Sequence, residues 1–211
     1  MHAALGDPVR LAIVDELTVS DRTPGDLCRR IDVSSNLLAH HVGVLEGVGI
    51  VERSRSSGDG RRRYVRLRHD RLDDLTLGGG LRPGPAMFVC SANSARSQLA
   101  AALWCSLADT TASSAGTHPA PVVHPEAVAA AERAGLDVAG CVPRRLPEAR
   151  HRPALVVTVC DRAHEELDAP DTWLHWSVDD PVAVGTADAF DRTVDELRER
   201  ITSVLTDASP R

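Results

Sequence analysis

One short stretch of the chain combines a cysteine, an arginine and small polar residues at a spacing that suits oxyanion chemistry. Five residues separate Cys90 from Arg96, and Ser97 follows directly. Five residues let the backbone curl so that successive N–H groups point at one centre, and a helix starting there adds the positive end of its dipole. Arg96 can then hold two oxygens of a tetrahedral oxyanion above the cysteine.

The same surroundings bear on the reactivity of Cys90. A thiolate is the reactive form of cysteine, and the helix dipole, the N–H groups and Arg96 are all expected to lower the pKa of this thiol. Ser97 can donate a hydrogen bond to the thiolate, and Asn93 can brace the loop. We therefore predict a nucleophile at Cys90 and an oxyanion site made by the residues that follow it: Ser91, Ala92, Asn93, Ser94, Ala95, Arg96 and Ser97.

Two residues far from this loop in sequence are candidates for the general acid and the second thiol of the reaction. Asp180, directly before Pro181, is the candidate general acid for a departing oxygen. Cys160 ends a strongly apolar stretch, at the side of a parallel sheet where ligands bind, and can attack an adduct on Cys90 to form a disulfide. Cys141 and an external thiol remain alternatives for that step, whereas Cys105 falls within a helix and is expected in the core.

The elements around these residues alternate between strand and helix. Short apolar stretches predict strands over 86–89, 111–114, 154–159 and 174–178. Capping residues and periodicity predict helices over 97–107, 125–134 and 186–205. This order predicts a doubly wound α/β domain with a four-stranded parallel sheet.

The part before residue 77 has a different pattern. Asp7-Pro8, Thr23-Pro24 and Ser34-Ser35 each open a helix, and two strands over 50–55 and 61–67 follow. Three helices and a hairpin are the order of a winged helix-turn-helix, an α+β domain. Polar residues at the start of the third helix and arginines near the hairpin tip are the candidate DNA contacts: Ser34, Ser35, Asn36, His40, Arg55, Arg61, Arg62 and Arg63.

Composition supports two domains of different charge. Glycines and prolines predict a linker over 77–84, between domains at 1–76 and 85–211. Residues 1–77 hold 12 Arg and 12 acidic residues, so the second part carries all of the net charge of −6. Seven Arg and one Asp lie within 53–68, which suits phosphate contacts.

The sequence predicts a cytoplasmic location without membrane insertion. Its five cysteines are unevenly spaced, and it shows no signal segment and no long apolar run.

Residues 3–70 resemble the ArsR/SmtB-type winged-helix repressors, most clearly in LGDPVRLAIVDEL and in DVSSNLLAHHVGVLEGVGIVERSRSSGDGRRRYVRL. The resemblance implies a homodimer that binds a double-stranded DNA operator. One sensor site of that family is a Cys-x-Cys pair, and here Cys28 matches the first position while Arg30 stands at the second. Cys28 is therefore a weak arsenite-ligand candidate, with a small buried hydrophobe as the alternative, and we expect no metal site.

Residues 85–205 resemble the low-molecular-weight tyrosine phosphatase superfamily and, within it, the arsenate reductases. Four separated stretches carry the resemblance: FVCSANSARSQ, SAGT, VVTVC and HWSVDDP. It implies that Cys90 is the nucleophile, Arg96 the oxyanion clamp, Asp180 the general acid and Cys160 the second redox cysteine. The third cysteine of the thioredoxin-coupled branch is missing, which points to a low-molecular-weight thiol with a glutaredoxin-like partner. In some relatives an acidic residue helps to bind a potassium ion, and its position here would fall near Ala101 or Ala102, so we expect no such cation site.

We therefore predict an arsenate reductase fused to a DNA-binding regulator, with arsenate or a similar oxyanion as substrate. No bound cofactor is expected, only an external thiol reductant of the low-molecular-weight thiol, glutaredoxin-like or thioredoxin class. One alternative is a low-molecular-weight protein tyrosine phosphatase, but Val182 and Val184 stand where aromatic walls for a phosphotyrosine ring are expected. The other is a regulator whose second domain only senses an oxyanion or redox state.

Overall fold

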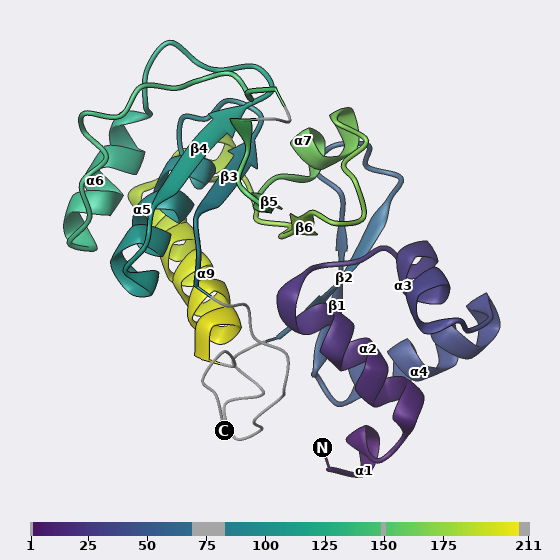
Figure 1. Cartoon of the computed structure of the whole chain (residues 1–211). Helices are drawn as coiled ribbons and strands as arrows, with labels where there is room; N and C mark the ends of the chain where they lie inside the picture. Colours follow the sequence, from purple (N-terminus) through teal and green to yellow (C-terminus); the bar gives the residue numbers. More distant parts are fainter. Residues whose placement is uncertain (1, 69–82, 149–150, 207–211) are drawn as a thin grey trace.

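The structure, a computed structural model, describes residues 2–68, 83–148 and 151–206 and shows two domains (Figure 1). Most of the predicted linker lies outside the described residues. The N-terminal domain is a winged helix-turn-helix, as predicted. Its elements are α1 (His2–Leu5), α2 (Pro8–Val19), α3 (Pro24–Ile31), α4 (Ser35–Gly47), β1 (Val51–Arg55) and β2 (Arg63–Leu67).

The predicted capping residues begin the helices of this domain. The Asp7 side chain accepts hydrogen bonds from two N–H groups at the start of α2. Thr23 and Asp26 form a reciprocal capping box on α3, and Ser34 caps α4. Such caps satisfy N–H groups that a helix leaves without partners. The apolar faces that these helices share form one core with the hairpin, containing Ile13, Leu17, Leu27, Leu38, Leu45, Ile50 and Val65.

The second domain is built on a parallel sheet in the order β4-β3-β5-β6. The strands are β3 (Ala86–Cys90), β4 (Ala112–Gly116), β5 (Leu155–Thr158) and β6 (Leu174–His175). The helices are α5 (Arg96–Ala108), α6 (Pro125–Arg133), α7 (Asp161–Glu166), α8 (Pro181–Val184) and α9 (Ala187–Thr206). α5 packs on β3, β4 and α9, whereas α7 packs on β3 and β5 beside the N-terminal domain (Figure 1). This confirms the doubly wound architecture.

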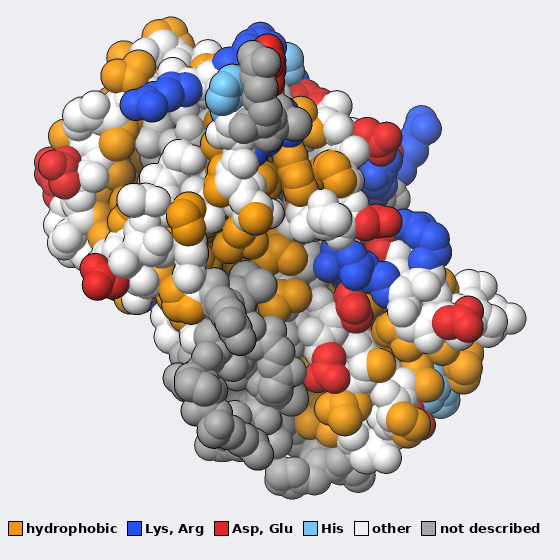
Figure 2. Space-filling model, viewed as in Figure 1, with side chains coloured by type: hydrophobic (Ala, Val, Ile, Leu, Met, Phe, Trp, Pro, Cys, Tyr) orange, Lys and Arg blue, Asp and Glu red, His pale blue; other side chains and the backbone are white. Residues whose placement is uncertain are grey.

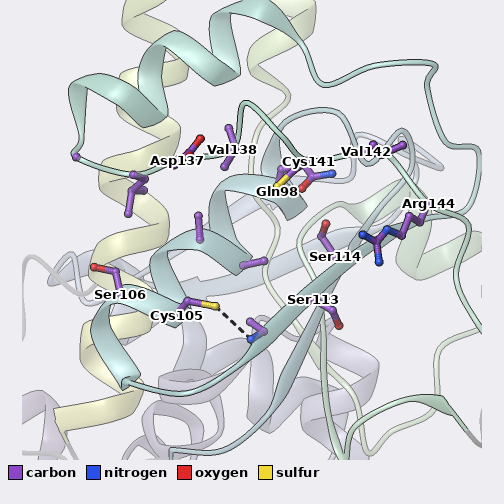
Figure 3. A pocket seen from close by; sticks show the side chains of 15 residues that line it. Gln98, Cys105, Ser106, Ser113, Ser114, Asp137, Val138, Cys141, Val142 and Arg144 are labelled. Carbon is purple, nitrogen blue, oxygen red and sulfur yellow. Dashed lines mark hydrogen bonds between the residues drawn. The ribbon is translucent and has the colours of Figure 1, made fainter.

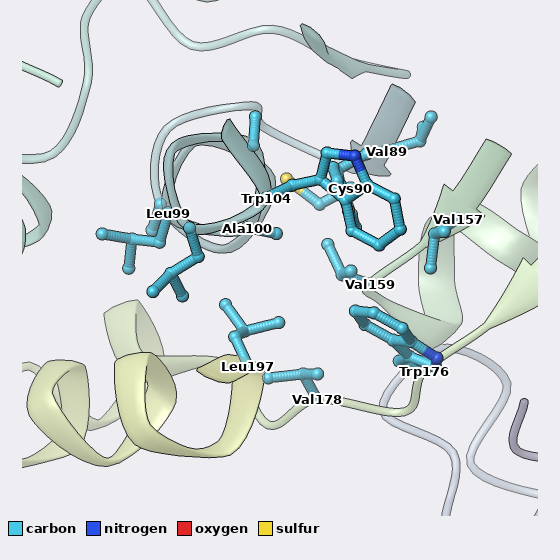
Figure 4. Packing of buried hydrophobic residues seen from close by; sticks show 14 of the residues in the cluster. Val89, Cys90, Leu99, Ala100, Trp104, Val157, Val159, Trp176, Val178 and Leu197 are labelled. Carbon is cyan, nitrogen blue, oxygen red and sulfur yellow. The ribbon is translucent and has the colours of Figure 1, made fainter. Parts of the chain in front are cut away.

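The core of this domain explains why its strands are continuously apolar. Every residue of β3 is buried, since helices cover the sheet. Trp104 of α5 and Trp176 after β6 are almost fully buried and flank Phe88, with ring centroids 5.8 and 5.9 Å from it. Figure 4 shows both tryptophans beside Val157 and Val159. Cys90 belongs to the same cluster, so its position is fixed by the core.

Three short helices and one strand end differ from the sequence prediction. α1, α7 and α8 span only four, six and four residues, too few for a helical period to show in the sequence. The strand predicted over 174–178 ends at His175. Beyond it, the Ser177 N–H donates to the Asp21 carboxylate at 2.6 Å instead of continuing the sheet.

Residues 20–22 join the two domains by bonding to both sheets. The Asp21 N–H donates to the His175 carbonyl at 2.7 Å, and Arg22 exchanges two backbone hydrogen bonds with Val65 of β2. Deeper in the contact, Arg200 of α9 forms an ion pair with Asp21 at 3.1 Å, and both side chains are buried. The domains therefore share a polar, buried interface. Among the described residues, no helix is both long and apolar enough to cross a membrane.

Candidate active site and nucleic-acid interface

The loop between β3 and α5 turns its carbonyl groups away from the thiol of Cys90. Four of these carbonyls accept backbone hydrogen bonds of 2.8 to 3.2 Å from residues within 117–124. A trans peptide places its N–H opposite its C=O, so the N–H groups that follow them point toward the loop centre. The Asn93 N–H donates to Cys90 Sγ at 3.2 Å. α5 begins at Arg96 after an alanine N-cap, which leaves its first N–H groups for a ligand.

Asn93 holds the shape of this loop. Its backbone has a φ of 50°, a left-handed conformation that asparagine tolerates better than most residues. Its side-chain amide donates to Ser97 Oγ at 2.8 Å, and its side-chain oxygen accepts the Arg144 N–H at 2.7 Å. Gln98 Nε2 donates to the Asn93 carbonyl at 3.1 Å. The loop is therefore braced from several sides before any ligand binds.

The Cys90 side chain contacts the groups that were expected around it, but the pKa of its thiol is raised and not lowered. Cys90 Sγ lies 3.0 Å from Ser97 Oγ, and the residue is 3 % exposed. Burial raises the pKa of the thiol, while Arg96 and the Ser97 hydroxyl act to lower it. The expected lowering is wrong for this loop, because the cost of burying a thiolate exceeds the stabilisation by these two groups.

Arg96 and Asp180 come together as their predicted roles require. Arg96 Nη2 lies 3.0 Å from the Asp180 carboxylate, and Nη1 donates to the Val178 carbonyl at 2.9 Å. The arginine is buried, whereas the Asp180 side chain is 40 % exposed and also caps α8 through the Val182 N–H. The guanidinium is thus fixed beside the Cys90 loop, with a carboxyl group reachable from solvent next to it.

Cys160 lies at the same end of the sheet and contacts the loop. It follows β5 and is buried, with Sγ 3.4 Å from Ser91 Oγ. The sequence placed Cys160 at the ligand-binding end of the sheet, and the structure places it there. A second thiol is therefore part of the surroundings of Cys90.

A buried polar network behind Cys160 was not predicted. Asp161 starts α7 and lies 3.1 Å from His175 Nε2, while Thr158 Oγ1 lies within 3.0 Å of Nδ1 of both His164 and His175. Burial acts to raise the pKa of Asp161, but hydrogen bonds from His175 and from the Ser57 N–H outweigh it and lower the pKa to about 2. The only sequence signal was an aspartate directly after Cys160, because the partners come from distant segments.

The remaining cysteines lie apart from the loop. Cys105 is exposed, so its predicted place in the core is wrong: it lines a cavity of about 570 Å³ beside β4, and its Sγ accepts the Ala112 N–H at 3.2 Å (Figure 3). Cys141 is exposed and lines the same cavity. Cys28 is partly buried against the N-terminal core. Among the described residues, no cluster of histidine, cysteine or acidic side chains could hold a metal ion.

The candidate DNA contacts are exposed. Ser34, Ser35, Asn36 and His40 lie at the exposed start of α4, and the four hairpin arginines also face solvent. Arg62 lies 3.7 Å from Asp59, and Arg55 donates to the Gly60 carbonyl. Figure 2 shows positive and negative side chains intermixed where this domain meets α7. The helix start and the arginines are therefore both accessible.

A parallel sheet with a Cys-x5-Arg loop after its first strand, joined to a winged helix, defines a cysteine-dependent phosphatase-type domain carried with a helix-turn-helix domain. The chain belongs to the low molecular weight phosphotyrosine protein phosphatase family, whose model matches residues 86–209. A helix-turn-helix domain model matches residues 5–54. No curated protein matches the chain.

Several solved structures are similar to the second domain. A YwlE mutant from Bacillus subtilis is 25 % identical, with a TM-score of 0.51 over 57 % of this chain and 95 % of that one. A low molecular weight protein tyrosine phosphatase from T. tengcongensis is 22 % identical, with a TM-score of 0.51 over 57 % and 96 %. An arsenate reductase from Archaeoglobus fulgidus is 26 % identical, with a TM-score of 0.47 over 56 % and 97 %.

Proposed function

We propose that the protein reduces arsenate to arsenite through a Cys90 thiolate adduct, and that its N-terminal domain binds operator DNA as a transcriptional regulator. The observation that carries the reductase is the second buried thiol. Cys160 Sγ contacts the anion loop (residues 91–97), at a distance of 3.4 Å from Ser91 Oγ. Hydrolysis of a phosphate ester needs only Cys90, Arg96 and Asp180. Reduction needs a further thiol that attacks the sulfur of the Cys90 adduct, and the position of Cys160 against the loop supports Cys160 in that role.

The first step forms a bond between sulfur and arsenic. Arg96 and the loop N–H groups hold the arsenate oxygens, and the Cys90 thiolate attacks the arsenic atom. One As–O bond breaks, and Asp180 supplies the proton with which that oxygen leaves as water. Arsenic is still As(V) in this adduct.

The second step transfers two electrons. Cys160, as its thiolate, attacks Cys90 Sγ, so that an S–S bond forms and the S–As bond breaks. The electron pair of the broken bond stays on arsenic, which leaves as As(III) in arsenite. The two thiols have become one disulfide, and two equivalents of an external thiol reductant restore them. That reductant is a low-molecular-weight thiol with a glutaredoxin-like partner, or thioredoxin.

The second candidate function is hydrolysis of phosphotyrosine in proteins, because the matching family model is that of phosphotyrosine phosphatases. The same loop and acid serve that reaction. The walls next to Asp180 favour it less, since Val182 and Val184 are exposed and aliphatic where a phenyl ring gains from aromatic contacts.

The test is arsenite release by the full-length protein with arsenate and each class of thiol reductant. We expect turnover by the wild type and by Cys105→Ser, an exposed cysteine outside the loop, and none by Cys90→Ser or Cys160→Ser. Hydrolysis of an aryl phosphate is measured in parallel. Cys90-dependent hydrolysis that survives Cys160→Ser, without arsenite release from any thiol, would replace the reductase with the phosphatase.

A further inference from the structure

The tip of the hairpin formed by β1 and β2, residues 56–59, is held by α7 of the phosphatase-type domain. The Ser57 N–H donates to Asp161 Oδ2 at 2.7 Å, and the Asp59 N–H donates to Glu165 Oε2 at 2.6 Å. The Ser56 hydroxyl donates to the other oxygen of Glu165 at 2.6 Å. Figure 1 shows the end of the hairpin beside α7. Two carboxylates of one domain therefore bind the backbone of the other.

The contact leaves no room for a further molecule between hairpin and helix. A Cβ added at Gly58 would overlap the Glu165 carboxylate and lie 2.9 Å from Arg162 Cα. The Arg162 backbone cannot move aside without disturbing α7. Tyr64 of β2 extends the contact, because its hydroxyl lies 3.3 Å from Glu165 Oε1.

A hairpin that reaches DNA offers the same groups to phosphate oxygens. Backbone N–H groups and arginine side chains are the usual donors to phosphates. Here the Ser57 and Asp59 N–H groups are taken by carboxylates, while the start of α4 and the hairpin arginines stay exposed. Asp161 and Glu165 would also repel a phosphate backbone that approached the tip.

We propose that α7 competes with DNA for the hairpin tip, so that docking on α7 and full engagement of DNA by the hairpin exclude each other. The inference rests on the DNA binding proposed above. It gives the phosphatase-type domain direct control over the DNA-binding domain, and the contact adjoins Cys160 through Asp161. By reciprocity, DNA that takes the hairpin tip must loosen α7.

The experiment measures binding of a fluorescein-labelled duplex of mixed sequence to the full-length protein at low salt, by fluorescence anisotropy. Gly58→Ala pushes the tip off α7 without changing any charge. Its control is Gly140→Ala, because a Cβ at Gly140 meets nothing within 4 Å. Glu165→Ala removes the acceptor of the tip, and Glu166→Ala removes one charge from the next position of α7. Thermal unfolding checks that every variant is folded.

We expect Gly58→Ala and Glu165→Ala to bind the duplex about fivefold or more tightly than the wild type, the lower end of typical coupling between sites. The two control variants should stay within about twofold of it. Hydrogen exchange in α7 of the wild type should accelerate when duplex is added.

Wild-type affinity in both Gly58→Ala and Glu165→Ala would overturn the competition and leave DNA binding standing. An equal gain in Glu165→Ala and Glu166→Ala, with none in Gly58→Ala, would reduce the effect to net charge and overturn it as well. No binding by any form would overturn both the competition and the proposed DNA binding.

Discussion

Burial sets the protonation of Cys90 more strongly than its neighbours do. Cys90 is 3 % exposed, and desolvation raises the pKa of its thiol although Arg96 and the Ser97 hydroxyl both favour the thiolate. Burial therefore favours the protonated thiol over the thiolate at Cys90. Attack on an oxyanion then depends on the groups that offset the cost of burying the thiolate. Of Arg96 and Ser97, Arg96 lowers the pKa of the thiol more.

We predict that alkylation of Cys90 by iodoacetamide, followed by mass spectrometry of its peptide, rises with a midpoint above the ordinary cysteine pKa of about 8.5. The reason is that burial raises the pKa of the thiol. Arg96→Met should move the midpoint higher still, because the guanidinium acts to lower that pKa. A midpoint below the ordinary value, or a downward shift in Arg96→Met, would contradict this account. Exposed Cys105 serves as the internal reference.

At the scale of elements, the end of β4 supports the anion loop from behind. A Cβ on Gly116 would lie 2.5 Å from the Ser91 carbonyl oxygen and 3.0 Å from Asn93 Cβ. The Gly116 N–H also donates to the Arg144 carbonyl at 2.8 Å. Strand and loop therefore approach so closely that only a glycine fits, and the loop shape depends on the strand.

We predict that Gly116→Ala weakens binding of inorganic phosphate by about tenfold or more, because a displaced loop no longer directs its N–H groups at one centre. Isothermal titration calorimetry measures the affinity, and circular dichroism checks the fold. Gly140→Ala, whose Cβ meets nothing within 4 Å, is the matched control. Unchanged phosphate affinity in a folded Gly116→Ala protein would show that the loop does not need this support.

At the scale of the whole molecule, buried polar contacts hold the two domains together. Asp21 accepts from Arg200 Nη1 at 3.1 Å and from the Ser177 N–H at 2.6 Å, and its side chain is 1 % exposed. The indole N–H of Trp176 donates to the Val19 carbonyl at 2.9 Å. Polar groups without water depend on one another, so loss of one partner exposes the cost of burying the other.

We predict that Arg200→Met lowers the free energy of unfolding by about 3 kcal/mol, because it leaves the Asp21 carboxylate buried without its cation. Adding Asp21→Asn should restore part of the loss. Arg192→Met on the same helix removes an exposed pair with Asp188 and should cost less than about 1 kcal/mol. Urea unfolding measures all four proteins. A loss for Arg200→Met no larger than that for Arg192→Met would contradict the role of the buried pair.

The sequence by itself determined the elements and residues that depend on near neighbours. Asp7, Thr23 and Ser34 mark helix starts because a cap bonds to N–H groups only two or three residues away. The spacing of Cys90 and Arg96 predicts their loop because strand, turn and helix follow one another there. Asp180 and Cys160 were candidates because each follows a recognisable strand.

Only the tertiary structure decided what depends on contacts between distant segments. The Asp161–His175 pair, the hold of Glu165 on the hairpin and the Asp21–Arg200 pair join residues 14 to 179 positions apart. The direction of the Cys90 pKa and the exposure of Cys105 also follow from packing. Burial and its electrostatic cost arise only when the chain folds, so no local pattern carries them.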